Sequence, residues 1–248
     1  MATAEPKLTR HQEAAAASRT ETRRRLLHAA EAEFTERGYA AATVAKIAAR
    51  AGVTVQTLYL AWGSKRALLR AYMEAALAGN DETSYPQARP DMIAAVLGEA
   101  LDDPQAIVRQ ISLLYRQIAE RAALGWQLYR DGAATDPEIA TDWQALQALR
   151  HQTFSTLINR LPARSLRPGL TRAAATDTAW AIASPDTYDM LVRTRGYTLD
   201  QYQKWITTSL TNLLLRADPE QPSSRRPSTR TGTQPSVKSD VGQGGPKR

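Results

Sequence analysis

Four successive residues, Thr54, Val55, Gln56 and Thr57, combine hydroxyl, methyl and amide groups in one short stretch. A glutamine amide donates one hydrogen bond and accepts another, which matches the edge of an adenine. Val55 and the methyl group of Thr57 can touch the methyl group of a thymine. These groups indicate recognition of base edges rather than bond making, provided that a helix presents them at an exposed N-terminal end.

Two short helices and a tight turn are needed to present these groups. Thr43 is a typical N-cap for the first helix, and residues 51–53 (Ala-Gly-Val) are typical of the turn that ends it. Thr54 caps the second helix, and Gly63 with Ser64 ends it and starts a longer third one. Two short helices joined by a glycine-containing turn form the helix-turn-helix, whose second helix enters the major groove of DNA.

A leading helix is expected before this pair. It starts at Ser18 or Thr20, and a left-handed glycine at Gly38 ends it. The apolar face of this helix contains Leu26, Leu27, Ala30, Phe34 and Tyr39. The inward-facing residues of the following helices are Val44, Ile47, Ala48 and Leu58.

The order of these pieces resembles the N-terminal domain of TetR-family transcriptional regulators. The matching segments are RLLHAAEAEFTERGY (25–39), TVAKIAARAGVT (43–54), TLY (57–59) and WGSK (62–65) before an apolar helix. The resemblance covers residues 22–72 and departs from the family pattern at Gln56, at Leu60 and at residues 62–63. It implies an all-α fold, with an N-terminal three-helix helix-turn-helix DNA-binding domain followed by a helical ligand-binding and dimerisation domain.

The resemblance also implies roles for single positions. Thr43, Tyr59 and Lys65 are expected to bind phosphate, whereas Gln56 and Leu60 are expected to face the groove. The full set of expected DNA-binding residues is Thr43, Arg50, Thr54, Val55, Gln56, Thr57, Tyr59, Leu60 and Lys65.

Several of these residues have a structural alternative. Thr43 would be a capping residue in any helical bundle, and Tyr59 can be a core aromatic with a wet hydroxyl. Arg50 can add positive charge beside DNA, as can Arg23 and Lys46, although Lys46 can equally be a solvated surface charge.

The remainder of the chain also follows helical periodicity after a polar loop at residues 79–90. Helices are expected at 91–101, 104–130, 136–161, 171–184 and 199–216, with a break near Gly125 as an alternative in the second. Rings and a few polar groups on the middle helices suit a small-molecule pocket, although each residue can instead belong to the core. The expected pocket residues are Tyr115, Arg116, Trp126, Tyr129, Trp143 and Phe154.

The last helices carry apolar side chains that need a partner surface. Residues 184–215 are similar to the two final helices of one branch of the TetR family, which usually form a four-helix dimer interface. The expected interface residues are Trp180, Ile182, Leu210, Leu213 and Leu214. A twofold dimer would place two recognition helices about 34 Å or more apart on a palindromic operator.

Composition limits the classes of function. The formal net charge is +7, and residues 1–80 hold 12 Lys and Arg against 7 Asp and Glu, which suits a phosphate-binding head. The absence of cysteine excludes disulfides and thiolate metal sites. No catalytic triad, phosphate loop or metal-ligand pattern is legible, so we expect no enzyme, no metal and no cofactor. Neither a signal peptide nor a membrane span is legible, which favours a cytoplasmic protein.

We therefore expect a sequence-specific DNA-binding transcriptional regulator, and most simply a repressor. It would act as a homodimer and be released by a small-molecule effector that the sequence does not identify. The alternative is a helical interaction module whose basic head binds RNA or an anionic membrane surface. The expected division is a disordered arm (1–18), a helix-turn-helix domain (19–65), a ligand-binding and dimerisation domain (66–216) and a disordered basic tail (217–248).

Overall fold

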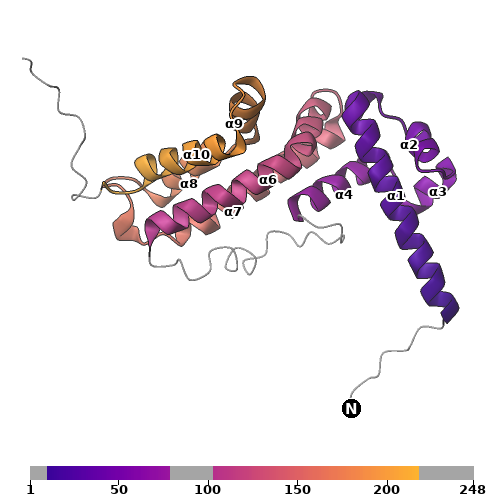
Figure 1. Cartoon of the computed structure of the whole chain (residues 1–248), viewed down its shortest axis with the longest axis horizontal. Coiled ribbons are helices and arrows are strands. Elements are labelled where there is room, and N and C mark those ends of the chain that lie inside the picture. The colour runs from indigo at the N-terminus through magenta and orange to yellow at the C-terminus, as the bar shows by residue number, and fades with distance from the viewer. Residues whose placement is uncertain (1–9, 79–102, 218–248) are drawn as a thin grey trace, which may run out of the picture. The chain divides into compact units, whose positions relative to one another are not determined.

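The computed structural model describes residues 10–78 and 103–217, and the regular elements in these ranges are helical (Figure 1). They are α1 (Arg10–Ala41), α2 (Val44–Arg50), α3 (Val55–Trp62), α4 (Lys65–Ala78), α6 (Pro104–Ala133), α7 (Pro137–Asn159), the 3-10 turn η2 (Ala163–Ser165), α8 (Arg172–Ile182), α9 (Pro185–Tyr188), the π-helical segment η3 (Asp189–Thr194) and α10 (Leu199–Leu214). The expected all-α class is confirmed. The loop and helix expected within 79–101 lie outside the described residues, as do 1–9 and 218–248.

The first helix is longer than the sequence pattern predicts. α1 begins at Arg10, so the expected start at Ser18 or Thr20 is wrong, and residues 10–18 are helical rather than disordered. An alanine run at 14–17 accounts for the difference, because alanine has the highest intrinsic helix propensity and needs no packed face. The expectation rested on an apolar face, which this part of the helix does not have.

Hydroxyl caps start the next three helices at the predicted positions. The side chains of Thr43, Thr54 and Ser64 each accept a hydrogen bond from the backbone N–H three residues later, at 3.3, 3.1 and 3.0 Å. Gly38 interrupts α1 with φ 71°, and Gly52 forms the turn between α2 and α3 with φ 65°. Both conformations favour glycine, so the predicted breaks are confirmed.

A hydrophobic cluster unites α1–α4 with the second half of α6. Its fully buried members include Leu26, Phe34, Ile47, Leu58, Leu68, Leu69, Met73 and Tyr129. Figure 1 shows α2 and α3 packed on one side of α1. The expected domain boundary after Lys65 falls at the first residue of α4, whose Leu68 and Leu69 belong to this cluster. A division of function at that point stays a prediction.

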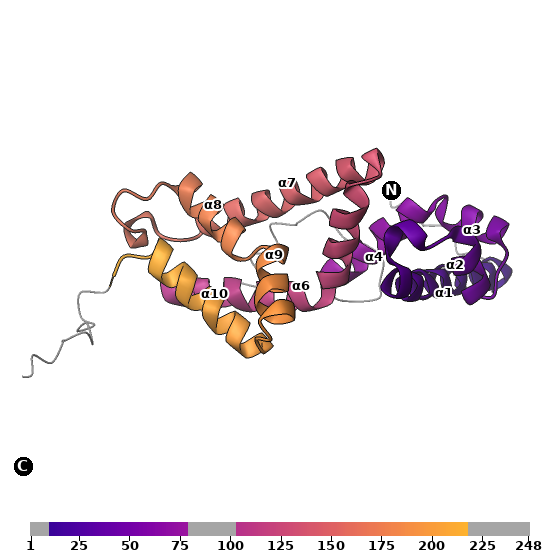
Figure 2. The same ribbon diagram turned by 90° about the horizontal axis from the view of Figure 1, so that it is seen from above.

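A second hydrophobic cluster is formed by α6, α7, α8 and α10 (Figure 2). In this cluster α6 packs on α7, α7 on α8, α8 on α10, and α10 on α6. The helices lie within a few residues of the predicted ranges, and α6 continues through Gly125 without a break. A Cβ at Gly125 would lie 2.6 Å from the Met73 sulfur, so this glycine allows α4 to approach α6 closely. None of the described helices is long and apolar enough to cross a membrane.

Two short helical elements between residues 184 and 198, α9 and η3, were not predicted. The Ser184 hydroxyl caps α9 by accepting the Thr187 N–H at 3.0 Å, and Pro185 occupies the first helical position. A hydroxyl residue followed by proline is a recognised helix start, so the signal was present in the sequence. Both elements are too short to show apolar periodicity, and both contribute to the cavity described below.

Candidate functional site

One face of α3 exposes large apolar side chains. Val55, Tyr59 and Leu60 are 37%, 49% and 82% exposed, and Gln56 is exposed beside them. Their spacing of one, four and five residues places them on the same side of the helix. Leu58 points the opposite way and is fully buried. An exposed apolar cluster on so short a helix marks an interaction surface.

The two threonines of this helix N-terminus are engaged with each other. Their hydroxyls lie 2.9 Å apart, and the Thr54 hydroxyl also caps the helix. Thr57 is half-buried, whereas Val55 and Gln56 are exposed. The structure thus brings the four expected base-reading residues together, with Gln56 as the amide that is open to a ligand.

Lys65 is held inside the fold rather than displayed on its surface. Its ammonium donates to the carbonyl oxygens of Tyr39 at 2.7 Å and Ala42 at 2.9 Å, and it lies 4.2 Å from the centre of the Tyr39 ring. Burial lowers the pKa of this ammonium. Two of its three N–H groups are therefore used to join the end of α1 to the start of α4, which leaves one for a phosphate.

We expect Lys65→Met to act mainly on stability. The change removes the donors for two carbonyl groups and should lower the free energy of unfolding by about 1–3 kcal/mol. Urea unfolding measures this loss, and Lys46→Met, at an exposed position on α2, is the matched control. An unaltered stability, together with a salt dependence of DNA binding that is flatter by a full unit, would instead assign Lys65 to phosphate binding alone.

Arg50 is similarly engaged within the protein. Its Nε lies 3.0 Å from Glu33 Oε1 and its Nη2 lies 2.7 Å from Glu36 Oε2. Glu33 is only 3% exposed, and its other oxygen accepts from Arg37 Nε at 3.0 Å. The expected contribution of Arg50 to DNA binding must therefore compete with two carboxylates that join α2 to α1.

Two arginines of α1 bind the carboxyl ends of the short helices. Arg23 donates to the Ala61 carbonyl at 2.7 Å and lies over the Trp62 ring at 3.9 Å, whereas Arg25 donates to the Ala51 carbonyl. A cation is favourable at a helix C-terminus, where the carbonyl groups lack helical partners. Much of the basic character of this region therefore holds α2 and α3 against α1.

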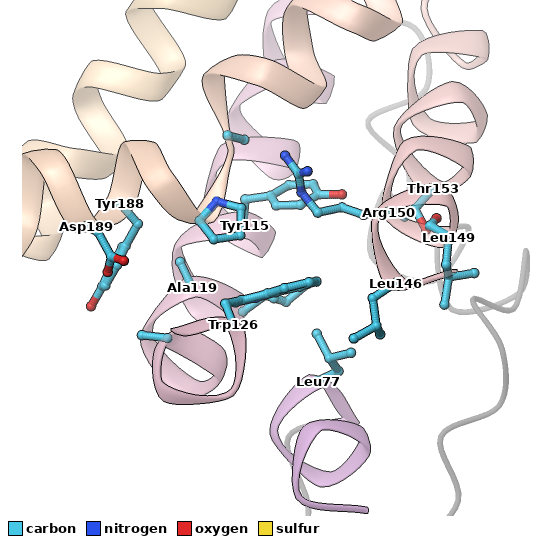
Figure 3. A pocket seen from close by; sticks show the side chains of 14 residues that line it. Leu77, Tyr115, Ala119, Trp126, Leu146, Leu149, Arg150, Thr153, Tyr188 and Asp189 are labelled. Carbon is cyan, nitrogen blue, oxygen red and sulfur yellow. The ribbon is translucent and has the colours of Figure 1, made fainter. Parts of the chain in front are cut away.

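A cavity lies between α4, α6, α7 and the α9 region (Figure 3). It encloses about 60 Å³. Its apolar walls include Leu77 of α4, Trp126 of α6 and Leu146 of α7. The polar groups on its lining are Tyr115, Arg150, Thr153, Tyr188 and Asp189. An apolar cavity with a few polar groups is the usual form of a small-molecule site.

The structure brings only some of the expected pocket residues to this cavity. Tyr115 and Trp126 line it, whereas Tyr129 lines a neighbouring cavity of about 370 Å³. Phe154 lies behind Tyr115, with the two rings stacked at 4.1 Å, and Trp143 packs edge-on against Trp126. These two residues support the walls instead of lining the cavity.

Arg116, which the sequence argument also placed in the pocket, does not line this cavity. Its Nη1 donates to Gln203 Oε1 at 2.8 Å and lies 2.6 Å from Asp200 Oδ1. Arg150 and Asp189 line the cavity instead, and the sequence argument missed both. The stretch around Arg150 offered no distinctive spacing, and Asp189 begins the π-helical segment η3, which periodicity did not reveal.

The expected dimer residues fall into two groups. Leu210 and Leu214 are fully buried in the chain's own core, so in this conformation they are not accessible to a partner subunit. Leu213 is 45% exposed, and Trp180 and Ile182 are partly buried at the edge of the same core. One turn of α10 places residues 210 and 214 on the inner face and residue 213 on the outer face. The sequence pattern cannot distinguish these two faces when both are apolar.

The described fold is a helix-turn-helix domain joined to a second, helical region. The N-terminal part matches the family model "Bacterial regulatory proteins, tetR family" over residues 26–72. This match assigns residues 26–72 to the type of N-terminal domain that TetR-family regulators carry.

Solved structures share this fold at low sequence identity. NalD of Pseudomonas aeruginosa, described as the secondary repressor of the MexAB-OprM multidrug efflux pump, is 20% identical with a TM-score of 0.61, over 80% of this chain and 98% of NalD. The SmeT–triclosan complex is 19% identical with a TM-score of 0.61, over 83% and 98%. SmeT is described as the repressor of the Stenotrophomonas maltophilia multidrug efflux pump SmeDEF. No curated protein matches the chain.

Proposed function

We propose that this protein is a transcriptional regulator of the TetR type: a ligand-released repressor that binds a palindromic operator as a homodimer. The exposed face of α3 carries this proposal, because Val55, Gln56, Tyr59 and Leu60 combine one amide with apolar and aromatic groups on a capped helix. A recognition helix in the major groove uses this combination to read base edges and thymine methyl groups. NalD and SmeT, which share this fold, are described as repressors, and this supports repression rather than activation.

Release of DNA would start at the cavity. Its volume of about 60 Å³ is smaller than most drug-sized ligands require, so a larger molecule must displace part of its wall. Leu77 of α4 belongs to that wall, and Leu77, Leu146 and Leu149 line the neighbouring cavity as well. Because α4 starts at Lys65 beside the recognition helix, its displacement would change how α3 meets DNA. The effector must prefer this displaced state.

The first experiment is selection of bound genomic fragments by the purified protein, followed by footprinting and sedimentation. We expect a protected palindrome, a dimer at micromolar concentration, and binding that weakens as salt rises. A monomer that protects a palindrome would contradict the dimer. Equal affinity for unrelated duplexes, or preference for RNA or anionic vesicles, would instead support the interaction-module alternative.

Gln56→Ala should weaken binding to the selected operator by about 1–3 kcal/mol, the contribution of a good base contact. Its affinity for nonspecific DNA and its thermal unfolding should stay unchanged, because Gln56 is exposed. Gln144→Ala, an exposed glutamine on α7, is the matched control. Fluorescence anisotropy on the operator and on single-base variants measures the effect. An unchanged base preference in Gln56→Ala would remove this residue from the readout.

A further inference from the structure

Arg150 is a buried cation whose hydrogen-bond acceptors are both uncharged. The residue is 7% exposed, its Nη1 donates to Gln147 Oε1 at 2.9 Å, and its Nη2 donates to the Trp180 carbonyl. Its Nε is buried and has no partner among the described residues. Burial lowers the pKa of this guanidinium to about 10, which still leaves it charged at neutral pH.

Arg150 places this charge at the wall of the cavity. The residue lines the cavity, and Figure 3 shows its side chain extending from α7 to the vicinity of Tyr115 on α6. The surroundings are mostly apolar, so an unpaired charge there is costly to the folded protein. A cost of this kind in a cavity is typical of a group that completes its interactions with a ligand.

The acidic groups nearest the cavity are already paired with other arginines. Asp189 on the lining lies 3.1 Å from Arg130 Nη2 and 3.4 Å from Arg193 Nη1. Asp186 lies 2.6 Å from Arg130 Nη1. Asp186 and Asp189 are therefore paired with other arginines. Among the described residues Arg150 forms no ion pair, and its guanidinium lies over the Trp180 and Phe154 rings, 4.9 and 5.7 Å from their centres.

We propose that the effector is an organic acid with an aromatic or other apolar body. Its carboxylate accepts a hydrogen bond from Arg150 Nε, while its body packs between Trp126 and the leucines of α7. The hydroxyls of Tyr115 and Thr153 lie on the same lining and can orient it. This inference rests on the proposed effector site and specifies its chemistry.

The test compares acids with amides of the same shape. Benzoate and benzamide, 1-naphthoate and 1-naphthamide, and decanoate and decanamide are titrated into the full-length protein by calorimetry at neutral pH. We expect at least one acid to bind at least about tenfold more tightly than its amide, the change expected from a charge-assisted hydrogen bond. Absence of binding by every acid, or equal binding of acid and amide in every pair, would overturn the proposal.

Two variants separate the ligand role of Arg150 from its structural contacts. Arg150→Met keeps an unbranched side chain but removes the charge and the N–H donors, so it should lose the preference for the acid while it retains affinity for the amide. Arg172→Met is the matched control, because Arg172 also donates to helix-terminal carbonyl groups, those of Ile158 and Leu161 at 2.9 Å, and does not line the cavity. Preserved acid preference in Arg150→Met would overturn the proposal. If that variant does not fold, Arg150→Lys takes its place and should weaken the preference.

DNA binding is measured separately so that the two proposals can fail independently. If the acid binds through Arg150 but the affinity for the selected operator does not change, the acid-binding site is supported and the release of DNA by this ligand is contradicted. If the protein binds the operator and neutral molecules release it while acids do not bind, the proposed ligand-released repressor is supported and the acidic effector is contradicted.

Discussion

Leu58→Ala should lower the free energy of unfolding by about 2–5 kcal/mol, whereas Leu60→Ala should change it by less than about 0.5 kcal/mol. The two leucines lie two positions apart on the same short helix, so helix propensity is nearly the same for both. They differ in burial, because Leu58 is fully buried and Leu60 is 82% exposed. Urea unfolding followed by circular dichroism measures both values.

For operator preference, we expect the larger change from Leu60→Ala and not from Leu58→Ala. Leu60→Ala removes an exposed side chain from the face that carries Gln56, so we expect altered preference among operator variants at unchanged stability. Leu58→Ala should reduce the folded fraction and weaken binding to all duplexes alike. Equal stability losses would contradict the burial of α3 described here. An identical operator profile for Leu60→Ala and the wild type would contradict the assignment of this face to DNA.

Disruption of the Arg66–Asp142 pair should reduce the response to an effector. Arg66 at the start of α4 donates two hydrogen bonds, at 2.7 and 2.8 Å, to Asp142 in the second turn of α7. A bidentate pair of this kind fixes orientation as well as distance. It joins the helix next to the recognition helix to a helix that lines the cavity. Allosteric effects are ordinarily about 5–150-fold in affinity, and we expect Asp142→Asn to reduce this effect at least about threefold.

A double-mutant cycle of Arg66→Met and Asp142→Asn tests whether the pair acts as a unit. We expect the losses in the free energy of unfolding of the two single variants not to add up to the loss of the double variant. Arg24 and Glu21 also form a bidentate pair, at 2.9 and 2.8 Å, but both are about half-exposed and lie on one helix. Their cycle should be nearly additive. Additive unfolding and an unchanged effector response for Asp142→Asn would exclude the pair as a route between cavity and recognition helix.

The stabilisation that the Arg66–Asp142 pair contributes should also depend on pH. The hydrogen bond from Arg66 holds the pKa of Asp142 below its ordinary value of 3.8. A carboxyl group with a lowered pKa stabilises the folded state above the ordinary value, and this contribution is lost as pH falls through the folded-state pKa. The stability difference between the wild type and Asp142→Asn should therefore be constant near neutral pH and decrease below about pH 4.

The sequence alone determined the helix-turn-helix and its capped boundaries. Threonine and serine caps, with glycine at the turns, act within three or four residues, so local spacing is sufficient to locate α2, α3 and α4. The buried position of Leu58 and the exposure of Gln56 also follow from helical period on so short an element. The resemblance of residues 22–72 to TetR-family regulators rests on the same local features.

Only the tertiary structure decided which charges are available and where the cavity lies. Lys65 and Arg50 were expected to be open to DNA, yet each bonds to groups at least 14 residues away in sequence. Arg150 and Asp189 reach the cavity because α7 and the π-helical segment after α9 pack beside α6. Leu210 and Leu213 differ in exposure because of the neighbours that cover α10. Long-range partners of this kind produce no periodic pattern along the chain. The sequence therefore predicts where the helices lie, whereas only the packing decides which side of each helix is buried.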